Sequence, residues 1–135
     1  MSVKNMHDLI NIGIVDDHNI YKKGLKLALS YYADLNVSLE AENGLDLLYK
    51  LQTLEPDLIL LDLQMSVMDG ITVLPHIKKQ FPHVKVIILS IYDDLSLVSK
   101  MIKLGADSYL SKSCEPGKMY YEIRKVMSNS LQLQY

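Results

Sequence analysis

The segment PDLILLDLQM, residues 56–65, indicates how this chain folds. Residues 58–61 form a run of four apolar residues, and short apolar runs of this kind are typical of strands buried inside a sheet. The run ends in a carboxylate, Asp62. This pattern predicts an acidic side chain at the tip of a buried strand, where its function has to be explained.

Strand and helix patterns alternate on both sides of this segment. Runs rich in β-branched residues predict strands, and apolar residues at helical spacing predict helices. The predicted strands cover residues 10–15, 36–41, 58–62, 84–90 and 107–111, and the predicted helices cover residues 20–32, 44–54, 71–81, 94–104 and 116–131. Five strand–helix units predict an α/β fold with one parallel sheet and helices on both faces.

Length and composition predict one globular domain. The chain has 135 residues, of which 49% are hydrophobic and 22% charged, and its net charge is −2. It has no block of like charge, which argues against direct binding to nucleic acid or to an anionic membrane. The one cysteine, Cys114, excludes an intramolecular disulfide and suits a reducing compartment. We find neither a signal-peptide core nor an apolar run near the ~20 residues of a membrane helix. The sequence therefore predicts a soluble cytoplasmic protein.

Four of the five predicted strands end beside a residue that can take part in chemistry. In open α/β sheets, the site lies beyond the carboxyl ends of the strands. The first strand is followed by two acids, the third ends in an acid, the fourth in a hydroxyl, and the fifth is followed by an ammonium: Asp16, Asp17, Asp62, Ser90 and Lys112. We expect these side chains to converge at one edge of the sheet.

This combination of groups points to phosphoryl transfer. Three neighbouring carboxylates repel one another, which raises their pKa values unless cations compensate. Mg²⁺ with oxygen ligands would compensate them, and Lys112 would add one further positive charge. A carboxylate beside Mg²⁺, an ammonium and a hydroxyl is equipped to accept a phosphoryl group as an acyl phosphate.

Four fragments resemble the receiver domain of bacterial two-component response regulators. They are VDDH (15–18), LLDLQMSVMDG (60–70), ILSIYDD (88–94) and GADSYLSK (105–112). Each fragment alone is weak evidence, but all four occur in order, and the match extends over nearly the whole chain. LSIYDD and the pair Lys112-Ser113 most resemble the NarL/FixJ (LuxR-type) class, whose receivers usually precede a helix-turn-helix DNA-binding domain.

The resemblance implies a flavodoxin-like fold, a doubly wound five-stranded parallel sheet with strand order 2-1-3-4-5. It also implies a set of residue roles. The implied phosphoacceptor is Asp62, the implied Mg²⁺ ligands are Asp16, Asp17, Asp62 and the backbone carbonyl of Gln64, the implied phosphoryl contacts are Ser90 and Lys112, and the implied switch residues are Ser90 and Tyr109. Phosphorylation would draw Ser90 toward the phosphate, turn Tyr109 inward and reshape the surface of the fourth helix, fifth strand and fifth helix.

The sequence departs from the family pattern at three positions. Ser66 stands where proline is usual, which would loosen the loop after Asp62 without removing a ligand. Ser113 replaces a proline that follows the lysine in many receivers with a cis bond, and the sequence does not decide the isomer here. Pro75 lies inside the third predicted helix and should delay or kink it.

Simpler interpretations remain open for several residues. Asp16 and Asp17 could cap the helix that follows them. Ser90 could be a plain turn residue, and Tyr109 could be an ordinary core aromatic. His18, next to the acids, is better explained as a surface histidine than as a metal ligand.

Three other functions compete with the signalling switch. A phosphatase of the haloacid dehalogenase type needs a second acid two residues after its nucleophile, and Gln64 at that position cannot act as a general acid. A flavodoxin-like or Rossmann cofactor binder needs a glycine-rich phosphate loop, but DDHNIYKKG (16–24) is acidic with one glycine. A receiver-like module that is never phosphorylated also remains open.

We interpret residues 1–127 as a receiver domain and residues 128–135 as a tail or the start of a linker to an output domain absent from this chain. A stand-alone receiver that acts through protein–protein contacts is the alternative. The resemblance implies a sensor histidine kinase as phosphodonor, possible homodimerisation on phosphorylation, and DNA contact only through the output domain. The protein would process only its own Asp62 and would not be an enzyme in the usual sense.

Overall fold

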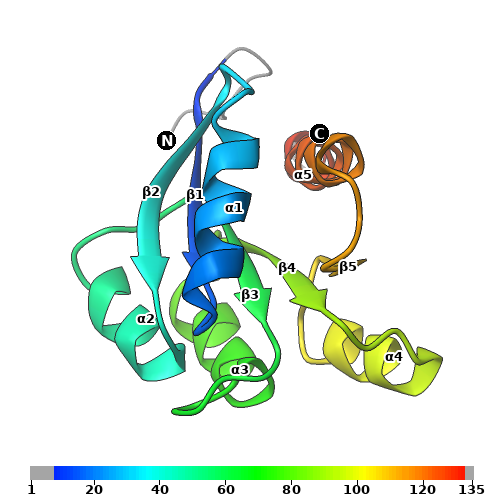
Figure 1. The fold of residues 1–135 in the computed structure, drawn as a ribbon. Coiled ribbons are helices and arrows are strands. Elements are labelled where there is room, and N and C mark those ends of the chain that lie inside the picture. The colour runs from blue at the N-terminus through cyan, green and yellow to red at the C-terminus, as the bar shows by residue number, and fades with distance from the viewer. Residues whose placement is uncertain (1–7, 133–135) are drawn as a thin grey trace.

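The fold is a five-stranded parallel sheet covered by helices on both faces (Figure 1). We describe residues 8–132 from a computed structural model, leaving out the side chains of residues 129–132. The elements are β1 (Ile10–Val15), α1 (Asn19–Leu29), β2 (Leu35–Ala41), α2 (Gly44–Leu51), β3 (Leu58–Asp62), α3 (Gly70–Gln80), β4 (Lys85–Ser90), α4 (Leu95–Lys103), β5 (Ser108–Ser111) and α5 (Pro116–Gln132). The predicted α/β fold is confirmed.

The strand order is β2-β1-β3-β4-β5, which confirms the order that the resemblance implied. Val15 pairs with Leu61 in the next strand, and Ser90 pairs with Ser111. All the paired strands are parallel, so their carboxyl ends lie at the same edge of the sheet. This edge is where the chemically active residues are expected.

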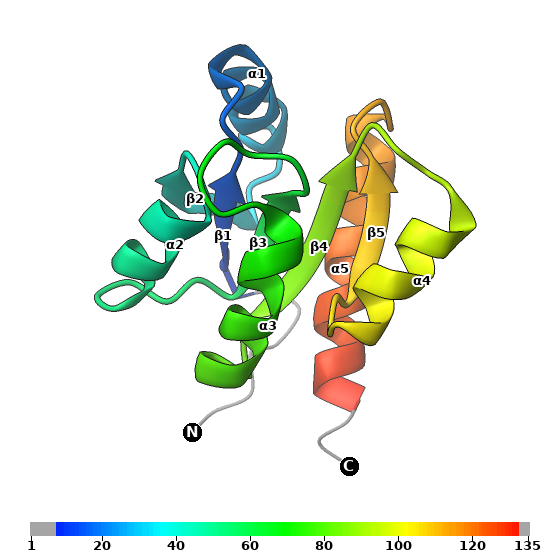
Figure 2. The same ribbon diagram turned by 90° about the horizontal axis from the view of Figure 1, so that it is seen from below.

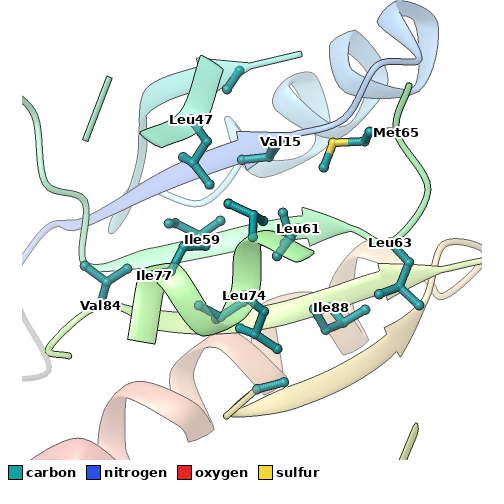
Figure 3. Packing of buried hydrophobic residues seen from close by; sticks show 14 of the residues in the cluster. Val15, Leu47, Ile59, Leu61, Leu63, Met65, Leu74, Ile77, Val84 and Ile88 are labelled. Carbon is teal, nitrogen blue, oxygen red and sulfur yellow. The ribbon is translucent and has the colours of Figure 1, made fainter. Parts of the chain in front are cut away.

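Two apolar clusters hold the helices onto the two faces of the sheet. The first cluster joins the sheet to α2, α3 and α4, and the second joins it to α1 and α5. Figure 2 shows these two groups of helices on opposite faces of the sheet. Figure 3 shows part of the first cluster, where Leu47 from α2 and Leu74 and Ile77 from α3 pack around Ile59 and Leu61. Each such side chain contributes about 1.5–3 kcal/mol when it is fully buried.

Three of the helices begin at an Asn or Asp side chain that accepts a backbone N–H. Asn43 caps α2 by accepting from Asp46 N at 2.8 Å, and Asp94 caps α4 by accepting from Leu97 N at 3.2 Å. Caps of this kind satisfy donors that the first helical turn leaves free. Gly105 follows α4 with φ of 112°, in agreement with its predicted place after the helix.

Some predicted helix ends differ from the structure. The first and second helices end at Leu29 and Leu51, three residues before their predicted ends. In both cases the apolar pattern runs on into a turn, where the chain leaves the helix. Helix α3 begins at Gly70, so Pro75 does not delay its start.

The structure also decides the isomer of the Lys112–Ser113 bond and the extent of the last helix. The Lys112–Ser113 peptide bond is trans, like the other peptide bonds of residues 8–132. Helix α5 continues to Gln132, so most of the predicted tail is helical, and residues 133–135 lie outside the described part, as do residues 1–7. Within residues 8–132, we find no helix with the length and apolar character needed to cross a bilayer.

Candidate functional site

The structure brings the predicted acids and their partners together at the carboxyl edge of the sheet. Asp62 is the last residue of β3, Ser90 is the last residue of β4, and Asp16 follows β1 directly. All three are buried, with exposed fractions of 5% for Asp62, 1% for Ser90 and 2% for Asp16. Asp17 is half-buried beside them.

Lys112 reaches this edge from the end of β5. Its Nζ donates to Asp16 Oδ2 at 2.7 Å and lies 3.3 Å from Asp62 Oδ2. Its backbone N–H donates to the carbonyl of Ser90 at 2.9 Å. The lysine is therefore held at its backbone by β4 and at its ammonium by two buried carboxylates.

Asp16 does not cap the helix that follows it. The capping residue of α1 is His18, whose side chain makes no capping hydrogen bond, so the interpretation of the acid pair as a helix cap is wrong. Asp16 Oδ1 instead accepts the backbone N–H of His18 at 2.8 Å. The Nδ1 atom of His18 lies 3.2 Å from Asp16 Oδ1 and 3.5 Å from Asp17 Oδ1, while its side chain is mostly exposed.

Burial governs the electrostatics of Asp62. Loss of water around the carboxylate raises the pKa of Asp62, and the negative charge of Asp16 raises it further. The ammonium of Lys112 acts in the opposite direction but does not cancel the shift. The folded protein therefore holds a carboxylate that would gain from a further positive charge.

The acidic side chains fit a hard divalent cation. Asp16, Asp17, His18 and Asp62 each offer a ligand atom, and these atoms lie within 4.8 Å of one another. Asp62 Oδ2 and Asp17 Oδ1 are buried and accept no hydrogen bond. Carboxylate oxygens are preferred ligands of Mg²⁺, so the donor set suits this ion.

Ser90 and Gln64 border a small cavity in front of Asp62. The cavity has a volume of about 50 Å³, and His18, Tyr92 and Lys112 also line it. Ser90 Oγ accepts the backbone N–H of Tyr92 at 2.9 Å. This contact between a serine hydroxyl and the N–H two residues on is typical of a turn, so it links Ser90 to the loop between β4 and α4 and leaves the interpretation as a turn residue open.

Tyr109 reaches the same loop from β5. Its hydroxyl donates to the Tyr92 carbonyl at 2.5 Å, and its ring packs against the first apolar cluster. Burial raises the pKa of Tyr109, although a hydrogen bond with Ser90 opposes the shift. Tyr109 is therefore part of the core and also contacts the loop next to the site.

The loop after Asp62 contains a contact that the sequence did not suggest. The backbone N–H of Ser66 donates to Asp17 Oδ2 at 3.3 Å. A proline at this position would lack that donor. Serine at this position thus allows a hydrogen bond to one of the acids that proline could not make.

Sequence reasoning also missed Tyr21. Its hydroxyl donates to the Lys112 carbonyl at 3.4 Å, and its ring centroid lies 4.7 Å from Lys112 Nζ. The two residues are 91 positions apart, and no motif of the sequence links them.

Comparisons with known proteins give matches over most of the chain. The family model for the response regulator receiver domain matches residues 12–124. The response regulator protein VraR from Staphylococcus saprophyticus is 36% identical over 120 residues, which cover 89% of this chain and 57% of VraR. The chain spans about half the length of the curated relatives that it matches.

Solved receiver structures share the fold. The receiver domain of the NarL response regulator from Mycobacterium tuberculosis superimposes with a TM-score of 0.80 at 27% identity, covering 87% of this chain and 98% of that one. A CheX–CheY complex from Borrelia burgdorferi, crystallised with BeF₃⁻ and Mg²⁺, gives a TM-score of 0.81 at 27% identity, covering 87% and 88% of the two chains.

Proposed function

The chain belongs to the response regulator receiver family, and we propose that it is a phosphoacceptor switch in which Asp62 receives a phosphoryl group. The donor is the phosphohistidine of a sensor histidine kinase. Support comes from the family match and from the set of side chains around Asp62. These residue roles are inferred from position and chemistry.

One observation carries the proposal. Asp62 is buried at the end of β3, and its Oδ2 atom accepts no hydrogen bond while it faces Lys112 Nζ at 3.3 Å. A buried carboxylate oxygen without a hydrogen bond is costly in a purely structural role. As a nucleophile, the same oxygen needs a lone pair free for the incoming phosphorus atom, with the ammonium of Lys112 beside it.

In the proposed reaction, an oxygen of Asp62 attacks the phosphorus atom of phosphohistidine. A new P–O bond forms as the P–N bond breaks, and the electron pair of that bond leaves with the imidazole nitrogen. Lys112 contacts a phosphoryl oxygen from one side, and Ser90 donates its hydroxyl hydrogen to another. Hydrolysis of the resulting acyl phosphate returns Asp62 to its carboxylate form.

Mg²⁺ is the cofactor that we propose for this site. Asp16, Asp17 and Asp62 would hold it, together with the backbone carbonyl of Gln64. When bound, the ion supplies positive charge that offsets the charge of the phosphoryl oxygens. The side chains fit this ion because three carboxylates meet at the site and two of their buried oxygens lack hydrogen bonds.

The response to phosphorylation would pass through Ser90 and Tyr109. Ser90 Oγ now accepts from Tyr92 N, and the Tyr109 hydroxyl donates to the carbonyl of the same residue. If Ser90 turns toward the phosphoryl group, Tyr92 loses one of these two contacts. The loop before α4 would then move, and the α4–β5–α5 surface with it.

The output lies beyond this chain in our proposal. Because the chain spans about half the length of its curated relatives, we infer a longer cytoplasmic regulator that acts on transcription through a DNA-binding domain. Homodimerisation on phosphorylation is part of this proposal. A stand-alone receiver that acts through protein contacts is the second candidate. Gln64 argues against a haloacid dehalogenase phosphatase, because an amide is no general acid.

The direct test is transfer from a small phosphodonor. The protein is incubated with acetyl phosphate, with Mg²⁺ or with EDTA, and its intact mass is recorded. We expect one phosphoryl group on the wild type in Mg²⁺, none in EDTA, and none on Asp62→Asn. Glu55→Gln, which alters an exposed acid before β3 and away from the carboxyl edge of the sheet, serves as the matched control and should be phosphorylated normally.

A second measurement covers an acyl phosphate too short-lived for mass detection. Beryllofluoride mimics the phosphoryl group and does not turn over, so NMR shifts at Ser90, Tyr109 and Lys112 should appear when it is added with Mg²⁺. A folded protein that gains no mass and shows no such shifts would overturn the proposal and favour a module that is never phosphorylated.

A further inference from the structure

Tyr21 contacts both ends of Lys112. Its ring centroid lies 4.7 Å from the ammonium nitrogen, and its hydroxyl donates to the backbone carbonyl of the same lysine at 3.4 Å. An ammonium within about 6 Å of a tyrosine ring is attracted to the electron-rich face of the ring. The Tyr21 side chain, on α1, thus contacts both the ammonium and the backbone of Lys112, which follows β5.

The ammonium of Lys112 needs such support because its own stem is flexible. A lysine side chain carries its charge on a flexible four-carbon stem, so the ammonium can occupy several positions. Here the side chain of Lys112 is only 11% exposed, with Nζ at 2.7 Å from Asp16 Oδ2 and 3.3 Å from Asp62 Oδ2. The ring of Tyr21 therefore adds a neutral contact to a charge that two acids share.

Free space lies beside this lysine. A cavity of about 250 Å³ separates α1 from the start of α5, and it is lined mainly by apolar groups. Tyr21 and Lys112 form part of its wall, and a Cβ added at Gly24, also in the wall, would meet no atom within 4 Å. Without the ring of Tyr21, the stem of Lys112 would have room to turn away from the acids.

We propose that Tyr21 is a positioning residue that keeps the Lys112 ammonium at the phosphoacceptor edge. This inference rests on the proposed function, because the lysine matters there as a contact for the incoming phosphoryl group. Tyr21 itself touches neither Asp62 nor the phosphoryl group in this proposal. It acts through Lys112, and its loss should slow phosphorylation without changing the metal ligands.

The competing explanation is that Tyr21 only fills space. Its ring does pack against the second apolar cluster, between α1 and α5. A residue that only fills space could be replaced by leucine with no effect on the lysine. The two explanations therefore differ in what they predict for Lys112, and that difference can be measured.

The test compares three variants of the 135-residue chain. Tyr21→Leu removes the ring, Tyr21→Phe keeps the ring without its hydroxyl, and Tyr32→Leu is the matched control. Tyr32 packs against the same apolar cluster but stacks on Tyr120, with ring centroids 4.1 Å apart.

Phosphorylation by acetyl phosphate at saturating Mg²⁺ should be about tenfold slower in Tyr21→Leu, within about threefold of wild type in Tyr21→Phe, and within about twofold in the control. The Mg²⁺ dissociation constant should stay within about twofold in all three.

NMR provides a readout that does not depend on phosphorylation. The ring of Tyr21 should shift the side-chain Hε protons of Lys112 upfield, and this shift should vanish in Tyr21→Leu and persist in Tyr21→Phe. Equal phosphorylation rates in wild type and Tyr21→Leu would overturn the role of Tyr21 alone. A rate loss as large in Tyr32→Leu as in Tyr21→Leu would overturn it too, because simple loss of packing would then explain both. A wild type that is never phosphorylated would overturn the proposed function itself.

Discussion

Lys112 donates its hydrogen bond to Asp16, at 2.7 Å, and not to the proposed phosphoacceptor. Asp62 Oδ2 lies 3.3 Å from the same ammonium, as an ion pair without a hydrogen bond. Asp16 thus holds the lysine next to Asp62 and leaves the Asp62 oxygen free to react. The two acids differ in how they meet the ammonium, because Asp16 accepts a hydrogen bond from it and Asp62 pairs with its charge.

Removing the charge of Asp62 should stabilise the protein at neutral pH without metal. Burial and the charge of Asp16 raise the pKa of Asp62. A raised carboxyl pKa gives stability that is present at low pH and is lost as the pH rises through the folded pKa. Wild type therefore bears a cost at pH 7 that Asp62→Asn removes. We expect the variant to unfold about 2–5 °C higher in EDTA at pH 7, measured by circular dichroism.

This gain should shrink toward pH 4, where Asp62 of the wild type becomes neutral. Mg²⁺ should raise the unfolding temperature of wild type but have little effect on Asp62→Asn. The variant lacks the Asp62 carboxylate as a metal ligand, and it also lacks the repulsion between Asp62 and Asp16 that the ion would relieve. Glu55→Gln, at an exposed acid before β3, should behave like wild type in both respects. A lower unfolding temperature for Asp62→Asn in EDTA at pH 7 would contradict this account of the site.

The sequence predicted the strands and their chemistry better than the contacts of the site. Apolar runs such as residues 58–61 predict buried strands because no other element hides four consecutive apolar side chains so well. Once the strands are parallel, Asp62 and Ser90 must share an edge with Asp16. The position of the site therefore followed from topology, with the strand order supplied by the family resemblance.

The remaining details depend on packing between residues distant in sequence. The ring of Tyr21 lies near Lys112 only because α1 and the end of β5 meet in space. Helix ends were overestimated since apolar periodicity continues into Tyr31 and Leu54, beyond the last helical residues. Periodicity reports which residues are apolar and does not report where backbone hydrogen bonds stop.

Asp34 should stabilise the protein only above the pH at which it ionises. Burial alone would raise the pKa of Asp34, but hydrogen bonds from Tyr120 and Arg124 lower it below its ordinary value. A lowered carboxyl pKa gives stability that is present above the unfolded pKa and is lost as the pH falls through the folded pKa. Asp34→Asn keeps the shape and loses the charge, so we expect it to lower the free energy of unfolding by about 1–2 kcal/mol at pH 7.

The loss should become smaller as the pH falls below about 4, the ordinary carboxyl pKa, toward the lower pKa of folded Asp34. Urea unfolding at several pH values measures it. Glu40→Gln is the matched control, because Glu40 pairs with Lys26 at 2.8 Å on the exposed surface, where such pairs contribute little. A loss for Asp34→Asn that is equal at pH 7 and pH 3 would show that its charge plays no part.

Ser90 should control the opening of the loop that precedes α4. Its hydroxyl accepts the Tyr92 N–H at 2.9 Å, and Ser90→Ala removes this acceptor. The Tyr92 amide hydrogen should then exchange with solvent about 2- to 10-fold faster, as expected for the loss of one hydrogen bond. Hydrogen exchange followed by NMR measures this rate, and amides in β1 serve as the internal reference. Unchanged exchange at Tyr92 would argue against the link from Ser90 to the loop.

Gly70 should be required for the backbone position of Asp62. A Cβ at Gly70 would overlap the carbonyl oxygen of Asp62 and lie 3.0 Å from Leu63 Cα. Both neighbours are backbone atoms at the end of a buried strand, so they cannot move aside cheaply. We expect Gly70→Ala to lower the free energy of unfolding by about 2 kcal/mol or more and to slow phosphorylation at temperatures where the variant is folded.

The matched control is Gly24→Ala in α1, where an added Cβ meets no atom within 4 Å. That change should stabilise the helix by about 0.5–1 kcal/mol. If both variants unfolded at the same urea concentration as wild type, the close approach of Gly70 to Asp62 would have no energetic consequence. The loop of residues 63–69, which brings Gly70 back to the end of β3, could then not be what sets the position of the phosphoacceptor.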